Sequence, residues 1–186
     1  SAHAINDALS RCEIGEYIGK PDKLTTFIKQ RYIWVSRITG GAKSNSLGQL
    51  AQDFVEHYIN EHLKLPSFSI NRSGRLPNVS HSDVNTDRDT SFDMVVKRGE
   101  RHVAVEVSFQ VTTNSGIERK AGQARSRFEQ IERAGHKVAY VIDGAGNFER
   151  ESALRTICAH SHCTVAFSKK ELDVLCEFIN DFLEDA

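Results

Sequence analysis

The sequence has few cysteines, no long hydrophobic run and almost no net charge. Its four cysteines lack the CxxC spacing of common zinc and redox motifs, which fits a chain kept in a reducing compartment. No stretch approaches the roughly 20 apolar residues that cross a bilayer, and no signal-peptide pattern begins the chain. A formal net charge of −1 argues against a protein that coats nucleic acid indiscriminately. Repeats and low-complexity tracts are also missing.

What is present is the composition of a globular protein. Of 186 residues, 39% are hydrophobic and 26% are charged, as in ordinary soluble domains. We expect one main domain over residues 46–186 and a separate N-terminal segment, mainly helical, over residues 1–45. Within that segment a short helix is predicted over residues 4–17, a helix start at Pro21, and a β-like run over residues 32–35.

Residues 90–110 predict two β-strands joined by a polar turn centred on Gly99. Asp93 opens the first strand, and Glu106 lies inside the apolar run of the second. Because side chains alternate across a strand, Glu106, Ser108 and Gln110 share one face, and the apolar residues between them share the other. A carboxylate in such a run faces water or meets a cation, since an unpaired buried charge is very costly.

Two acids on adjacent strands form a plausible Mg²⁺ site, because Mg²⁺ prefers oxygen ligands. The backbone carbonyl of Val107 could complete the coordination. Three other acids compete with Asp93, which we prefer because it alone borders an apolar strand that would hold it opposite Glu106. The three competitors are Asp83, Asp87 and Asp89.

Two amphipathic helices flank this hairpin. The first, over residues 47–63 with Ser46 as its cap, has one apolar stripe and a polar remainder. The second, over residues 117–134, has a core stripe with spacings of 4, 3, 4 and 3. Its other face is rich in basic and amide side chains, suited to holding phosphate; the alternative is a solvated face with i,i+4 ion pairs. The candidate DNA-binding residues there are Arg119, Lys120, Gln123 and Arg127.

The C-terminal third predicts alternating strands and helices. A buried strand over residues 138–142 leads into a turn at Asp143, whose glycines do not complete a dinucleotide fingerprint. A helix over residues 149–160, a strand over 164–167 and a helix begun by Ser168 follow. The order of elements indicates an α/β sandwich with a mixed sheet.

Three polar segments allow two interpretations each. Arg72 and Arg75 lie in an irregular region suited to base and phosphate contacts, but any exposed loop has this composition. Lys43 follows a Gly-Gly pair without Walker spacing, so a plain loop is favoured over a DNA-backbone contact. The segment Cys158–Cys163 contains two histidines, yet incidental thiols at a helix end are favoured over a metal site.

The two-carboxylate hairpin resembles the core of PD-(D/E)xK nucleases, over roughly residues 45–170. A narrower likeness, to type II restriction endonucleases of the DpnII/MboI kind, comes from three segments and the Ala124-Arg125-Ser126 run. The segments are Phe92–Val96, Val105–Phe109 and Val141–Gly144. This resemblance implies a restriction-endonuclease-like three-layer α/β/α sandwich with a central mixed sheet. It also implies a cytoplasmic bacterial protein without a membrane partner.

The same resemblance implies a Mg²⁺-dependent endonuclease acting on double-stranded DNA, as a homodimer or with a partner nuclease subunit. Asp93 and Glu106 would hold the metal ion. Ser108 stands where the family usually has lysine, so Ser108 itself or Lys120 would serve there, and Glu56, with Gln52 next, is the candidate from the preceding helix. The DpnII/MboI likeness suggests GATC as the target, and residues 1–45 would serve recognition or dimerisation.

Two alternatives remain open at this point. One is another nuclease of the same fold, such as a repair nickase or a junction resolvase. The other is a catalytically degenerate nuclease fold that only binds DNA or a partner protein, which the serine in place of lysine keeps possible.

Overall fold

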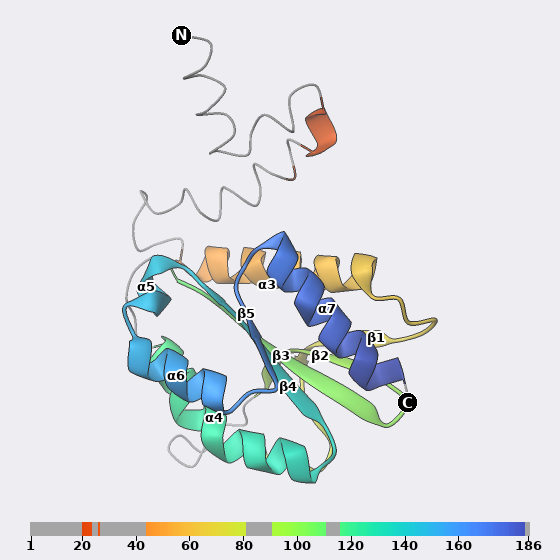
Figure 1. The fold of residues 1–186 in the computed structure, drawn as a ribbon, viewed down its shortest axis with the longest axis vertical. Coiled ribbons are helices and arrows are strands. Elements are labelled where there is room, and N and C mark those ends of the chain that lie inside the picture. Colours follow the sequence, from red (N-terminus) through yellow and green to blue (C-terminus); the bar gives the residue numbers. More distant parts are fainter. Residues whose placement is uncertain (1–19, 24–25, 27–43, 81–90, 111–115, 185–186) are drawn as a thin grey trace. The chain divides into compact units, whose positions relative to one another are not determined.

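The computed structural model describes residues 20–23, 26, 44–80, 91–110 and 116–184. The chain divides into two compact units, Ser1–Gly40 and Gly41–Ala186 (Figure 1). The helix predicted over residues 4–17, the β-like run over residues 32–35 and the side chain of Lys43 lie outside the described residues.

A five-stranded mixed sheet forms the centre of this unit, in the order β1-β2-β3-β4-β5. The strands are β1 (Ser69–Gly74), β2 (Phe92–Arg98), β3 (Arg101–Phe109), β4 (Lys137–Asp143) and β5 (Cys163–Val165). The first three strands pair antiparallel, whereas β4 and β5 extend the sheet in parallel. The predicted hairpin is confirmed, and Gly99 at its turn has a φ of 53°, a conformation that glycine adopts without strain.

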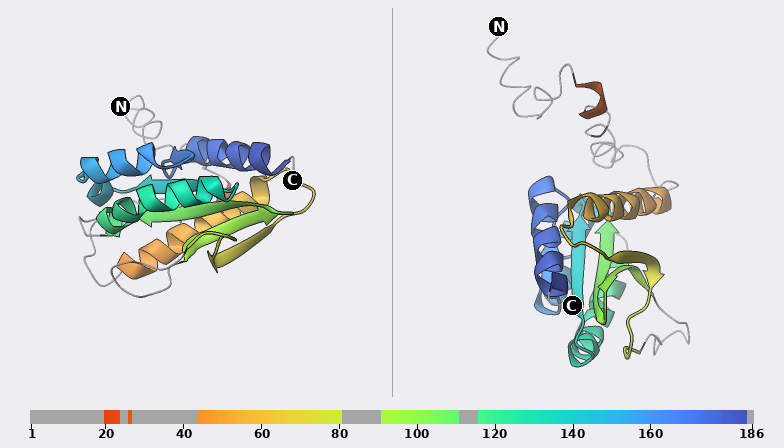
Figure 2. Two further views of the ribbon diagram at one scale, coloured as in Figure 1. Left: turned by 90° about the horizontal axis from the view of Figure 1, so that it is seen from below. Right: turned by 90° about the vertical axis from the view of Figure 1, so that its right-hand side faces the viewer.

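Helices cover both faces of the sheet, so the predicted α/β/α layering and mixed sheet are confirmed (Figures 1 and 2). The first pair, α3 (Ser44–His62) and α7 (Lys169–Glu184), lies on one face and is joined by a 2.5 Å hydrogen bond from Tyr58 to Asp173. The second pair, α4 (Gly116–Arg133) and α6 (Glu151–Ala159), lies on the other.

The buried side chains follow the predicted patterns. On α4 the predicted stripe packs into the core with Val95, Ala104 and Tyr140 from the sheet. On the opposite face Phe109 meets Phe167, and Phe167 meets Phe54 of α3, at ring-centroid distances of 5.8 and 5.2 Å. Since the side chains of Phe109 and Glu106 lie on opposite faces of β3, the predicted alternation of side chains along this strand is confirmed.

Two segments differ from the prediction. The helix expected over residues 149–160 is preceded by a separate short helix, α5 (Ala145–Phe148), and the strand expected over residues 164–167 is β5, Cys163–Val165. Gly144, directly before α5, has a φ of +97°, and its added Cβ would lie 2.2 Å from the carbonyl oxygen of Gln110. Only glycine fits there, so the end of β3 and the start of α5 approach closely.

None of the described helices is both long enough and apolar enough to cross a membrane.

Candidate functional site

Asp93 lies where β2 separates from β3. The pairing of β2 with β3 ends at Met94 and Val105, so Asp93, the next residue outward along β2, has no partner on β3. Here the Asp93 carboxylate replaces the missing backbone partner: its Oδ2 accepts a 2.8 Å hydrogen bond from the Val107 N–H. Its Oδ1 accepts a 2.9 Å bond from Nε2 of Gln52 on α3. These contacts fix the carboxylate against both the sheet and a helix.

Glu106 lies at the centre of β3, with its side chain 6% exposed and directed towards α4. Its register partner on the neighbouring strand is Tyr140. Of the two predicted alternatives, water or a cation, the structure shows the second, because Lys120 and Arg127 of α4 both contact Glu106. Since these residues are seven positions apart, about two helical turns, they project from the same face of the helix.

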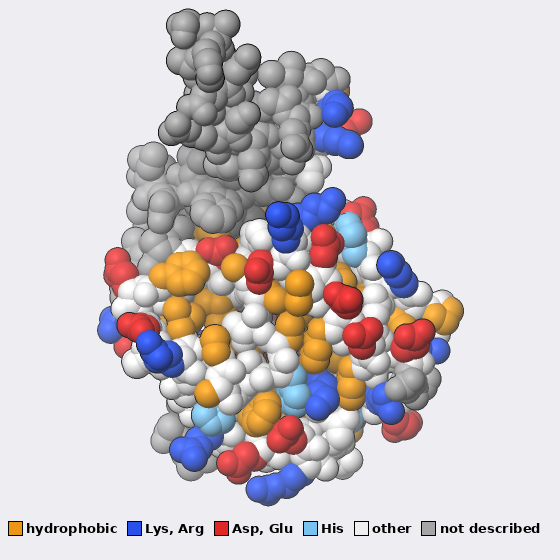
Figure 3. Space-filling view, in the orientation of Figure 1, with side chains coloured by type: hydrophobic (Ala, Val, Ile, Leu, Met, Phe, Trp, Pro, Cys, Tyr) orange, Lys and Arg blue, Asp and Glu red, His pale blue; other side chains and the backbone are white. Residues whose placement is uncertain are grey.

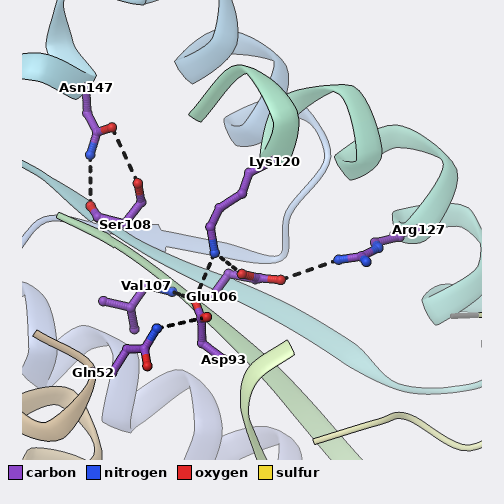
Figure 4. A network of polar contacts seen from close by, with 8 residues as sticks. All are labelled: Gln52, Asp93, Glu106, Val107, Ser108, Lys120, Arg127 and Asn147. Atoms are coloured by element: carbon purple, nitrogen blue, oxygen red, sulfur yellow. Dashed lines mark hydrogen bonds and ion pairs between the residues drawn. The ribbon is translucent and has the colours of Figure 1, made fainter. Parts of the chain in front are cut away.

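Lys120 joins the two acids (Figure 4). Its Nζ donates a 2.8 Å hydrogen bond to Oδ2 of Asp93 and also contacts Oε2 of Glu106. Arg127 approaches the second oxygen of Glu106, with Nη1 3.4 Å from Oε1. The guanidinium carbon of Arg127 lies 5.1 Å from the ring centroid of Phe92, which supports it by a cation–π contact.

The environment drives the pKa values of the two acids apart. Burial raises the pKa of Glu106, and the nearby charge of Asp93 adds to the increase, although Lys120 opposes it. Burial also acts to raise the pKa of Asp93, but the charge and hydrogen bond of Lys120 and the N–H of Val107 outweigh it, so the net change is downward. Two carboxylates in one site behave in this way when each has a different set of partners.

The same cluster keeps Lys120 charged. Burial acts to lower the pKa of Lys120, but the charges of Glu106 and Asp93 outweigh it and raise that pKa above its ordinary value. Tyr140 completes the surroundings: burial, followed by the charge of Glu106, raises the pKa of its hydroxyl, so it stays neutral. The site therefore combines two acids with two cations.

The donor chemistry fits a hard divalent cation. The carboxylates of Asp93 and Glu106 already converge on one cationic atom, the Lys120 Nζ, and carboxylate oxygens are the ligands that Mg²⁺ prefers. Magnesium often takes only one or two carboxylates and completes its shell with water and substrate phosphate. Within the described residues no group of three or more His, Cys, Asp or Glu side chains could hold a metal ion.

Ser108 points to a different partner. Its Oγ donates a 3.4 Å hydrogen bond to Oδ1 of Asn147 on α5. Asn147 is fully buried, and its Nδ2 donates to the carbonyl oxygens of Ser108 and Asp143, at 2.9 and 2.8 Å. Asp143 in turn accepts a 3.0 Å bond from the Phe167 N–H. This network holds the ends of β3 and β4 together. The sequence does not predict this role for Asn147, because nothing in its sequence context marks it as buried.

Glu56 does not join the carboxylate pair in the structure. It lies one turn beyond Gln52 on α3, where Oε2 accepts a 2.5 Å hydrogen bond from Nε of Arg72. Arg72 also forms a 2.6 Å ion pair with Asp53. The structure therefore places Gln52 at the site, whereas Glu56 and Arg72 form an ion-pair cluster between α3 and β1.

The other candidates divide by position. Arg119 and Arg75 are exposed, and Gln123 is half-buried. The competing acids at positions 83, 87 and 89 lie outside the described residues. At the Cys158–Cys163 segment the cysteines are free thiols, and Nδ1 of His162 accepts a 3.2 Å bond from the Val138 N–H, as expected for a structural role.

Fold and site together define an α/β protein with two neighbouring acids, one buried and one partly buried, at the point where two central strands separate. A family model described as "BanI C-terminal domain" matches residues 21–183. The chain is 51% identical over 180 residues to the type II restriction enzyme BanI of Aneurinibacillus aneurinilyticus, covering 97% of this chain and 50% of that protein. It is 49% identical over 175 residues to the type II restriction enzyme HgiCI of Herpetosiphon aurantiacus, covering 93% of this chain and 50% of that one.

The chain therefore belongs to the BanI C-terminal domain family. It spans about half the length of the two relatives. The predicted relationship to type II restriction enzymes is confirmed. The narrower DpnII/MboI likeness, its GATC target and the PD-(D/E)xK assignment are not confirmed by these matches and stay predictions. No solved structure matches the chain.

Proposed function

We propose that this chain carries the nuclease site of a type II restriction enzyme of the PD-(D/E)xK kind, which hydrolyses phosphodiester bonds in duplex DNA with Mg²⁺. The observation that carries the proposal is the convergence of Asp93, Glu106 and Lys120 on one point. The names of the two relatives support a restriction enzyme, and this convergence supports a hydrolytic site in the part of the chain that they share.

Asp93 and Glu106 would hold the metal ion. The Val107 carbonyl is a third candidate ligand: a strand residue directs its N–H and its C=O to the same neighbour, and the Val107 N–H points to Asp93. Bound Mg²⁺ would supply a water of lowered pKa and neutralise charge on the phosphoryl group. Gln52 keeps the Asp93 carboxylate oriented from the side of α3.

Lys120 takes the place of the lysine that the family usually carries two residues after the glutamate. The Ser108 side chain is engaged with Asn147, whereas Lys120 reaches both acids from α4. Together with Arg127 it supplies positive charge beside the scissile phosphate, where the transition state gains negative charge. This arrangement favours an active nuclease over the catalytically degenerate binding module.

Surface residues of this unit would contact the DNA backbone. Arg119 and Arg75 are exposed and can reach phosphates, and Gln123 lies beside Lys120 on α4. Arg72 would have to exchange its partners Asp53 and Glu56 for a phosphate, and Lys43 stays a candidate. We further propose a homodimer, since two copies of one site can act on the two strands of duplex DNA.

The test is cleavage of a defined plasmid in Mg²⁺ by the wild-type chain and by Glu106→Gln. The substitution removes one charged ligand but keeps the shape of the side chain, and the rate should fall at least about 100-fold, as when a transition-state contact is removed. Glu177→Gln is the matched control, because Glu177 is an exposed acid of α7. Undiminished cutting by Glu106→Gln would exclude the proposed site.

A further inference from the structure

The oxygens assigned to the metal ion already have a cation of the protein's own. Lys120 Nζ lies 2.8 Å from Oδ2 of Asp93 and contacts Oε2 of Glu106, so it occupies the point at which both carboxylates converge. A divalent cation held by the same two acids would need that point. Lys120 and the metal ion therefore cannot both keep these contacts.

The charge of the cluster leads to the same conclusion. Asp93 and Glu106 contribute two negative charges, and Lys120 and Arg127 contribute two positive charges, so the four side chains are neutral together. Adding a divalent cation without moving a side chain would leave two unbalanced positive charges among groups that are at most 21% exposed. Such a site is disfavoured unless a cation leaves or an anion arrives.

Of the two cations, Lys120 is the one that can leave. Arg127 contacts the other oxygen of Glu106 and lies against the Phe92 ring, so its guanidinium is held from two sides. The Lys120 ammonium sits at the end of a flexible four-carbon stem, and its side chain is 17% exposed. It can move away from the carboxylates while α4 stays in place.

We propose that Lys120 is a displaceable internal cation, which neutralises Asp93 and Glu106 in the metal-free protein and leaves them when a divalent cation binds. This proposal rests on the proposed function. The displaced Lys120 ammonium would then pair with a DNA phosphate beside the same two acids. Metal ion and DNA should therefore strengthen each other's binding, because the phosphate stabilises the displaced position of Lys120.

The experiment measures Ca²⁺ binding by the full 186-residue chain without DNA, by calorimetry and by thermal melting. Lys120→Gln removes the competing charge, and its Kd for Ca²⁺ should be at least about tenfold lower than that of the wild type, because a unit charge a few ångströms away opposes the dication. Lys120→Arg keeps the charge and should stay within about threefold of the wild type. Arg125→Gln, an exposed position on α4, controls for the loss of overall charge.

Each outcome decides the question. Tighter binding by Lys120→Gln that is abolished in Asp93→Asn/Lys120→Gln supports the proposal and locates the ion. If Lys120→Gln is unfolded without metal, folding driven by Ca²⁺ supports it equally, and a melting temperature insensitive to Ca²⁺ overturns it.

Affinity no tighter in Lys120→Gln than in the wild type would overturn the displacement. If the wild type still cleaves plasmid in Mg²⁺, the proposed function survives that result. If neither protein binds Ca²⁺ and the wild type does not cleave, both proposals fail.

Discussion

At the scale of single residues, the site consists of two acids whose surroundings differ. Asp93 has three donors, from Gln52, Val107 and Lys120, whereas Glu106 is more deeply buried and depends on Lys120 and Arg127. The lowered pKa of Asp93 and the raised pKa of Glu106 follow from this difference. Glu106 is therefore the acid whose ionisation limits the site as the pH falls.

The cleavage rate should fall on acidification at a higher pH than an ordinary glutamate would require. Under the proposed function only ionised Glu106 would hold the metal ion, and the pKa of Glu106 is raised by burial. Arg127→Gln removes a cation beside it and should move the acidic limb of the pH–rate profile up by about one unit, as expected for losing one nearby opposite charge. Arg133→Gln is the control, because Arg133 is exposed and forms an ion pair with Glu129 on the same helix. This variant should have the pH–rate profile of the wild type. An unchanged profile for Arg127→Gln would contradict the role of Arg127.

The stability of the protein should respond to the two acids in opposite directions. A raised folded-state pKa means that the stabilising effect of protonated Glu106 is lost as the pH rises through that value. The lowered pKa of Asp93 means that the stabilising effect of its ionised form is lost as the pH falls through the folded-state pKa of Asp93.

At the scale of elements, α3 and α4 each send one side chain to the acid pair from opposite faces of the sheet. Gln52 comes from α3 and Lys120 from α4, and both bind Asp93. Asp93 can be reached from both faces because it lies where the β2–β3 pairing has ended.

Gln52→Ala should lower the cleavage rate or the divalent-cation affinity about tenfold, the lower end of the effect of removing a residue that orients a metal ligand. Glu56→Ala is the matched comparison, one turn along the same helix and paired with Arg72, and should change the rate less. Measuring kcat/KM for both variants shows whether Gln52, which binds Asp93, or Glu56, which binds Arg72, contributes more to cleavage. A larger loss for Glu56→Ala would contradict the role of Gln52 and support Glu56, the residue that the sequence predicts.

Asn147 should contribute more to stability than its place on the short helix α5 suggests. Asn147→Ala removes the hydrogen bonds to the carbonyls of Ser108 and Asp143, although the Asp143 carbonyl keeps the Gln110 N–H as a donor. About 1–3 kcal/mol of unfolding free energy should be lost, at about 0.5–1.5 kcal/mol for each of the two bonds. Urea denaturation measures this loss of unfolding free energy. Asn180→Ala, which removes a single part-exposed bond to the Lys64 N–H, should cost less than about 1.5 kcal/mol. Equal losses would contradict a special role for Asn147.

Much of this scaffold follows from local sequence. The hairpin around Gly99, the alternation along β3 and the stripe of α4 depend on residue spacing, which is visible in the chain. Contacts between elements do not. Whether Gln52 or Glu56 reaches Asp93 depends on the rotation of α3, and whether Lys120 reaches both acids depends on how α4 lies on the sheet.

At the scale of the whole molecule, the DNA binding that we propose would have to come from local charge. The formal net charge is −1, and Figure 3 shows acidic and basic side chains mixed over the face that it presents. The acid pair with its two cations is a neutral cluster until a dication joins it. Strong binding to phosphate should then depend on divalent cations, and raised salt should weaken it.

The central claim is that Asp93 and Glu106 jointly hold the metal ion that hydrolysis requires. The most direct measurement is anomalous diffraction from crystals of the chain soaked in Mn²⁺. We expect a peak between the two carboxylates, with the Lys120 ammonium moved away from it. Carboxylates that point apart, with no ion between them, would contradict the account.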